Sequence, residues 1–167
     1  MKPVQPEGDN ALELGLDMDR KVFVDLEELR TTRLLVQGNS GSGKSHLLRK
    51  LMEESTGIIQ QVIIDPEGDF VSLGETFGHK IIDAGKFAIE KRAGIAGRVR
   101  QHRGSVVLNL EALDMERQMD FVAVFLSGLF DAPHEHWFPA LVFVDEAQIF
   151  APSADNGESK ETRKAYR

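Results

Sequence analysis

Cysteine is absent from the 167 residues of this chain, which excludes disulfides, thiolate metal sites and a cysteine nucleophile. An excess of positive charge is also lacking. The 20 Lys and Arg residues stand against 27 Asp and Glu, and the formal net charge is −7. This balance argues against a broadly basic nucleic-acid-binding surface, although a local basic loop that lines a pore would hardly alter it.

Long apolar runs are missing as well. No stretch approaches the roughly 18 consecutive apolar residues of a membrane helix, and the opening MKPVQPEGDN lacks the apolar core of a signal peptide. We therefore expect a soluble, cytoplasmic protein with no membrane partner. The length and the 41% hydrophobic content predict one domain, over residues 11–167. Residues 1–10, with two prolines, one glycine and mixed charges, are expected to form a flexible leader.

The most specific stretch in the chain is GNSGSGKS, residues 38–45. It fits the spacing G-x-x-x-x-G-K-[ST] of a phosphate-binding loop, in which backbone N–H groups and the positive end of the next helix hold an anion. Lys44 is expected to reach the terminal phosphates, and Ser45 to hold a Mg²⁺ ion that bridges them. The alternative is a Gly/Ser loop that only turns a strand into a helix. The residues predicted to bind ATP are Gly38, Asn39, Ser40, Gly41, Ser42, Gly43, Lys44, Ser45 and His46.

Continuous apolar runs predict the strands of a mostly parallel sheet that is covered on both faces. Between them, apolar residues at helical spacing predict helices after the Gly-rich loop and from Asp114 on. The alternation of strands and helices predicts an open α/β fold. The predicted strands lie at residues 34–36, 62–64, 106–108 and 141–144.

The residues before this sheet show a different pattern. Alternating apolar residues at 12–24 predict a two-stranded ribbon at a sheet edge, followed by one helical turn at residues 26–30. Residues 86–103 are the most basic segment, and their poor apolar spacing predicts a weak helix. Such a helix faces nucleic acid or a neighbouring subunit, or it is a solvated helix face, which is the interpretation we favour.

A second part of the site is predicted in LVFVDEAQ, residues 141–148. Four apolar residues place Asp145 at the carboxyl end of a buried strand, where ligands of open α/β sheets gather. We interpret Asp145 as the residue that orients Mg²⁺ and Glu146 as the catalytic base that activates water, acting together with the catalytic Lys44. An acidic pair that caps the next helix is the alternative. For Gln148, three interpretations stay open: a sensor of the γ-phosphate, a contact to a neighbouring subunit, or a surface glutamine.

Asp65 also ends a predicted strand, in VIIDPEGDF. Pro66 and Gly68 predict a turn there, and three carboxylates fall within five residues. Asp65 and Asp69 are accessory candidates that order Mg²⁺ or water. Helix N-capping by either residue is an equally weighted interpretation.

Three segments together resemble a known family. GNSGSGKSHLLRKL, IIDPEGDF and LVFVDEAQIFAP are similar to the phosphate loop, the second-strand motif D-P-x-G-[ED]-[YF] and the Walker B motif D-E-A-[HQ] of the HerA/FtsK superfamily. The resemblance is closest to the HerA-like ATPases of the DUF87 type and spans residues 22–152. It implies a RecA-like ATPase core that uses ATP and Mg²⁺, forms a hexameric ring, moves along double-stranded DNA and often works with a partner nuclease. It gives Lys44, Ser45, Asp145 and Glu146 the roles assigned above.

Two features depart from the family pattern. HerA proteins usually carry an amino-terminal β-barrel, whereas only the short ribbon precedes the core here. The family's sensor strand and arginine finger would follow residue 167, so we expect a truncated chain, incomplete at its carboxyl end, with weak turnover. Two other functions remain alternatives to a DNA translocase or helicase: a nucleotide-binding module without useful turnover, and a P-loop kinase that acts on a small acceptor.

Overall fold

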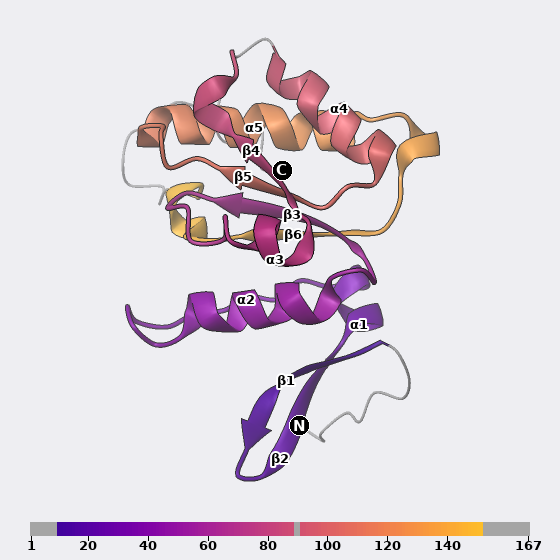
Figure 1. The fold of residues 1–167 in the computed structure, drawn as a ribbon, viewed down its shortest axis with the longest axis vertical. Helices are drawn as coiled ribbons and strands as arrows, with labels where there is room; N and C mark the ends of the chain where they lie inside the picture. The colour runs from indigo at the N-terminus through magenta and orange to yellow at the C-terminus, as the bar shows by residue number, and fades with distance from the viewer. Residues whose placement is uncertain (1–9, 89–90, 152–167) are drawn as a thin grey trace. The chain divides into compact units, whose positions relative to one another are not determined.

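The computed structural model describes residues 10–88 and 91–151 (Figure 1). Their backbone divides into two compact units. The first contains the described residues up to Gln60 together with Pro139–Leu141, and the second contains Gln61–Phe138 and the described residues from Val142 on. A two-stranded sheet belongs to the first unit, and most of a four-stranded sheet belongs to the second.

The first unit begins with an antiparallel ribbon made of β1 (Ala11–Asp17) and β2 (Arg20–Asp25). Its two turn residues, Met18 and Asp19, both have positive φ, which is the pattern of a type I′ hairpin turn. The ribbon confirms the strands expected over residues 12–24.

The expected position of this ribbon at the edge of the main sheet is wrong, because it forms a separate two-stranded sheet. The strand register shifts between Glu13 and Gly15. Such an irregularity increases the local twist and interrupts the row of backbone groups with which a further strand would pair.

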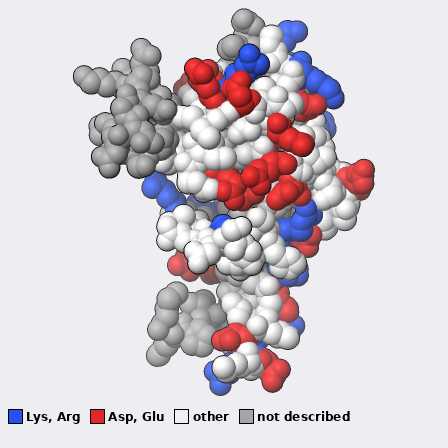
Figure 2. Space-filling model, turned by 90° about the vertical axis from the view of Figure 1, so that its left-hand side faces the viewer, with Lys and Arg blue, Asp and Glu red and all other residues white. Residues whose placement is uncertain are grey.

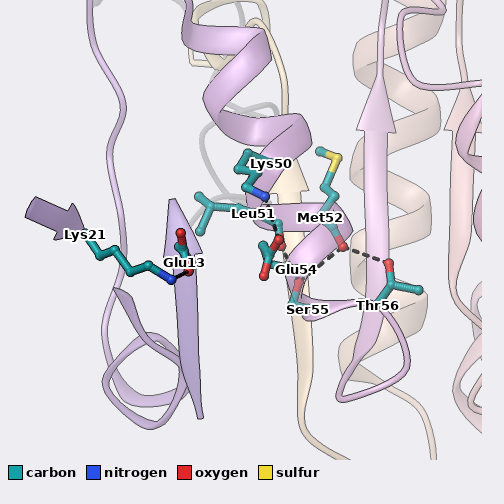
Figure 3. Close-up of polar contacts among 8 residues, drawn as sticks. All are labelled: Glu13, Lys21, Lys50, Leu51, Met52, Glu54, Ser55 and Thr56. Atoms are coloured by element: carbon teal, nitrogen blue, oxygen red, sulfur yellow. Dashed lines mark hydrogen bonds and ion pairs between the residues drawn. The ribbon is translucent and has the colours of Figure 1, made fainter. Parts of the chain in front are cut away.

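Two helices follow the ribbon. α1 (Leu26–Thr31) starts at Asp25, whose side chain accepts a hydrogen bond from the N–H of Glu27. α2 (Lys44–Ser55) packs against β1. At its carboxyl end, the Ser55 and Thr56 hydroxyls donate to main-chain carbonyls one turn earlier, those of Leu51 and Met52 (Figure 3). The bond to the Met52 carbonyl satisfies one of the four acceptors that the end of a helix otherwise leaves open.

The second unit is organised around a parallel sheet in the order β4-β5-β3-β6. Its strands are β3 (Gln60–Asp65), β4 (Lys80–Asp83), β5 (Val106–Asn109) and β6 (Ala140–Val144). They confirm the strands predicted at residues 62–64, 106–108 and 141–144, and with them the α/β class. β3 is buried along its whole length, as a strand covered on both faces must be.

Helices cover both faces of this sheet (Figure 1). α4 (Arg92–His102) and α5 (Met115–Phe130) lie on one face, where their apolar side chains join those of β3 and β5 in one core. α3 (Leu73–Phe77) lies on the other face, and the Ile81 side chain of β4 is close to Gly74 there. The fully buried core side chains include Ile64, Leu108, Leu110, Phe121 and Phe125.

One predicted strand is wrong. Residues 33–39 have no regular structure, and the side chains of Leu34 and Leu35 are 50% and 72% exposed. A strand requires a neighbour for its backbone N–H and C=O groups. In the described part of the chain, this three-residue apolar run pairs with neither sheet.

Within the described ranges, no helix has both the length and the apolar character that crossing a membrane requires.

Candidate functional site

The Gly-rich stretch forms an exposed loop that leads directly into α2. Gly41 and Gly43 have φ values of +76° and +91°, a conformation that glycine adopts without strain. A Cβ atom at Gly38 would require the Ser42 hydroxyl to turn away. The loop is thus a compact turn with its backbone open to solvent.

Asn39 closes the loop. Its carbonyl accepts hydrogen bonds from the Ser42 N–H at 3.1 Å and from the Lys44 amine at 3.2 Å. The Lys44 side chain therefore bends back over the loop that it follows. This is the position from which an amine meets an anion bound in the loop.

The start of α2 is open to an anion. Gly43 provides no side-chain cap, and the first turn carries no acidic residue. The first N–H groups of this 12-residue helix therefore keep their hydrogen-bonding capacity at its positive end. Ser45 lies half-buried in this first turn, whereas His46 is exposed.

Asp65 organises the turn after β3. The carboxylate is fully buried, and it accepts hydrogen bonds from the N–H groups of Gly68 at 2.9 Å, Asp69 at 3.0 Å and Phe70 at 2.9 Å. Burial raises the pKa of Asp65 above its ordinary value and the Asp69 charge adds to this, while the three N–H donors oppose it. Three of its lone pairs thus serve the turn, so Asp65 caps this turn and not a helix. The next helix, α3, begins after Ser72 and has no side-chain cap, so helix N-capping by Asp65 or Asp69 is wrong.

Asp145 directly follows β6 and is 3% exposed. Its N–H donates to the Ile64 carbonyl at 3.1 Å, which extends the pairing with β3 by one residue. Burial raises the pKa of Asp145, and the charges of Glu146, Asp65 and Asp69 raise it further, against a hydrogen bond from the Glu146 N–H. A buried carboxylate near three others is a place where a bound cation would be stabilising.

Further acidic residues follow strands of the four-stranded sheet. Glu67, Asp69 and Glu111 are exposed and follow β3 and β5. Figure 2 shows Asp and Glu side chains gathered in a broad group on one face of the molecule. Among the described residues, no group of three or more His, Cys, Asp or Glu is arranged to hold a metal by itself. Mg²⁺ that arrives with a nucleotide requires fewer, because it takes one or two carboxylates together with phosphate oxygens and water.

Glu146 lies between β6 and a short 3₁₀ turn, η4 (Ala147–Ile149). Its φ is +46°, in the left-handed region that is uncommon and strained for residues other than glycine. The Gln148 side-chain amide donates a hydrogen bond to the Glu146 carboxylate. The structure thus brings Gln148 against the predicted base of its own chain.

Gln118 is a buried polar residue that the sequence reasoning missed. It lies on the inner face of α5, and its side-chain amide donates to the carbonyls of Pro66, Leu110 and Leu113 at 3.1–3.2 Å. It therefore ties α5 to the turn after β3 and to the loop after β5. A glutamine on the apolar face of an amphipathic helix was the available signal.

Several basic side chains of residues 86–103 make contacts within the second unit. The Arg100 guanidinium donates to the carbonyls of Leu129 at 3.4 Å and Phe138 at 2.8 Å, and Arg103 lies over the Phe138 ring. Lys86 forms an ion pair with Asp83 at 3.0 Å. These contacts favour a structural role for residues 86–103 over a nucleic-acid-facing one.

The first unit carries a Gly-rich loop with the spacing of a phosphate loop on an uncapped helix, and the second carries most of a parallel sheet with acidic residues at strand ends. Both features are typical of P-loop nucleotide-binding proteins. A family model described as Helicase HerA, central domain (DUF87), matches residues 12–135. The chain belongs to this family of P-loop ATPases. The matched range contains the loop and the Asp65 turn and ends before Asp145. No curated protein and no solved structure matches the chain.

Proposed function

We propose that this chain binds ATP through residues 38–45 and hydrolyses it, as the motor core of a HerA-type DNA translocase. One observation carries the proposal. In a chain of the HerA family, the phosphate-loop sequence forms a closed turn on a helix whose N–H groups no side chain caps. The strand-end acids Asp145 and Glu146 add the groups that hydrolysis needs beyond binding.

Binding uses the loop backbone and Lys44. The N–H groups from Gly41 to Ser45 surround the phosphates, and the glycines let the backbone approach the phosphate oxygens. The Lys44 amine exchanges its hydrogen bond to the Asn39 carbonyl for one to a phosphate oxygen. Because an amine–phosphate bond is charge-assisted, the exchange favours the bound state.

Ser45 and Asp145 are the residues that would hold Mg²⁺. A hydroxyl and a carboxylate are ligands that Mg²⁺ prefers, and the raised pKa of Asp145 marks a carboxylate whose negative charge is otherwise disfavoured. When bound, Mg²⁺ supplies charge neutralisation at the phosphate oxygens. Asp65, whose oxygens already serve its own turn, would act only through the position of that turn, and Asp69 would order water as an exposed carboxylate.

Glu146 acts as the general base. Its carboxylate accepts a proton from a water molecule as the water oxygen attacks the γ-phosphorus and the bond to the β–γ bridging oxygen breaks. ADP and inorganic phosphate leave, and the proton passes to solvent. Lys44 stabilises the charge that develops on the phosphate oxygens.

Family membership supports the wider assignment. We propose that the chain works in the cytoplasm, in a hexameric ring that moves along double-stranded DNA beside a partner nuclease. An arginine finger supplied by a neighbouring subunit would accelerate hydrolysis by about 10³- to 10⁵-fold. Turnover by the isolated chain is therefore expected to be slow.

Two variants test the site. Lys44→Ala is expected to weaken Mg-ATP binding by about 100-fold or more, because it removes a charge-assisted contact to phosphate. Glu146→Gln is expected to keep the affinity and to lower turnover by about 10²- to 10⁴-fold, because it removes the base. Titration calorimetry gives the affinity, and ADP release gives the turnover.

Lys50→Ala is the matched control for Lys44→Ala. Lys50 lies on the same helix and pairs with Glu54 at 2.6 Å, so its loss leaves the loop unchanged. Tight Mg-ATP binding by Lys44→Ala would contradict the site assignment. ADP release that needs an added acceptor would instead indicate a kinase, and binding without turnover at any protein concentration would indicate a nucleotide-binding module.

A further inference from the structure

The contact between Gln148 and Glu146 is unusual for residues two apart. On a helix, side chains at positions i and i+2 point in different directions and do not face each other. Here Glu146 has φ and ψ of 46° and 44°, and this left-handed turn lets the two side chains meet. The strained backbone and the hydrogen bond from the Gln148 amide to the Glu146 carboxylate therefore occur together.

The turn that carries both side chains is anchored at its two ends. Before it, the Asp145 N–H is bonded to the Ile64 carbonyl of β3. After it, Phe150 is 4% exposed and belongs to the core under α4 and α5. Within the turn, the Ile149 N–H donates to the Glu146 carbonyl at 2.9 Å. The backbone that carries Glu146 and the exposed Gln148 is thus held at both ends, which keeps the two side chains close together.

We infer that Gln148 is a positioning residue for ATP hydrolysis: it holds the Glu146 carboxylate in the orientation from which it accepts the proton of the attacking water. This inference rests on the function proposed above. Glu146 is only half-buried, and a glutamate side chain has three rotatable bonds whose freedom lowers the time spent in a productive geometry. The hydrogen bond from Gln148, which is carried by the same turn, favours one orientation of the carboxylate. Gln148 itself does not need to touch the nucleotide.

Gln148→Met tests this role, because methionine keeps the length of the side chain and removes the donor. We expect kcat for ATP to fall about 10- to 100-fold while KM changes about twofold or less, since only the orientation of the base is lost. Gln148→Glu places a second carboxylate beside Glu146 and is expected to reduce kcat at least as much. Gln101→Met, on the exposed side of α4, is the matched control.

A double-variant cycle separates positioning from a structural role. If Gln148 acts through Glu146, Gln148→Met added to Glu146→Gln changes the residual turnover by about twofold or less, whereas independent effects would multiply. A merely structural role would lower the free energy of unfolding and leave the two effects independent. A denaturant titration of each variant measures that stability.

A second readout needs no turnover. Gln148 side-chain amide signals in a ¹H–¹⁵N NMR spectrum, identified by their loss in Gln148→Met, are expected to shift in Glu146→Ala and to stay in place in Glu67→Ala. Unmoved signals would overturn the inference, as would equal kcat in Gln148→Met and the parent chain. Absence of turnover in the parent chain would overturn the proposed function and this inference with it.

Discussion

The carboxylate of Asp65 is expected to make a large contribution to the free energy of unfolding. Asp65→Ala is expected to lower the free energy of unfolding by about 2–4 kcal/mol, because three N–H groups in a buried turn lose their acceptor. Asp69→Ala, in the same turn but exposed, is the control and is expected to change it by about 0.5 kcal/mol or less. Urea unfolding measures both, and equal effects would contradict the capping role.

The fold disfavours the protonated, charged form of His79. It is 4% exposed, and its Nε2 donates to the Gln61 side-chain oxygen at 2.8 Å, since an amide oxygen only accepts. Burial lowers the pKa of His79 below its ordinary value. The folded chain therefore binds this proton less readily than the unfolded chain does, and stability is full above the ordinary pKa and lost as the pH falls below it.

The resulting prediction is a difference between two pH profiles. Between pH 7 and about 5.5, the free energy of unfolding of the parent chain is expected to fall relative to that of His79→Gln, which cannot titrate. His102→Gln, an exposed position on α4, is expected to follow the parent chain. Denaturant titrations at several pH values give the comparison, and parallel profiles for the parent chain and His79→Gln would contradict it.

At the residue scale, the sequence alone identified positions whose neighbours are close in the chain. Lys44 and Ser45 follow from the spacing of one loop, and Asp65 from the end of one apolar run. Gln118 and His79 did not emerge, because their partners include residues 52 and 18 positions away, Pro66 and Gln61. A contact of that kind depends on the packing of elements, which periodicity does not reveal.

Among the elements, the hairpin turn between β1 and β2 has an unfavourable backbone conformation that a substitution can relieve. Met18 and Asp19 both adopt positive φ, which an Asn-Gly pair accommodates more easily. Replacing them with Asn and Gly is expected to stabilise the ribbon by about 1 kcal/mol, read from slower amide hydrogen exchange in β1 and β2. Replacement of both by alanine is the control and is expected to give no gain. Equal exchange in the two variants would show that the turn is not strained.

The outcome of each element prediction depends on the apolar pattern of the segment and on whether the segment has a neighbour to pair or pack with. β3 and β6 stand out as unbroken runs, and α5 as a long amphipathic helix, so all three were predictable. β4 was missed because its sequence KIID offers only two apolar residues and it lies at the edge of the sheet. The opposite error occurred at residues 34–36, where an apolar run has no partner strand among the described residues.

For the whole molecule, the sequence predicted the class of fold but not the order β4-β5-β3-β6, which depends on which strands pair. The family match over residues 12–135 indicates an ATPase, which the fold alone does not, since α/β sheets support many activities.

The most direct test of the proposed motor is ATP hydrolysis measured against protein concentration, with and without linear double-stranded DNA. Mg-ATP binding is measured on the same preparation. We expect turnover that rises more than linearly with protein concentration, increases with DNA and disappears in Lys44→Ala, because the proposed motor works as a ring on DNA and binds ATP through Lys44. Mg-ATP binding with no turnover at any concentration, with or without DNA, would contradict a motor and leave a nucleotide-binding module.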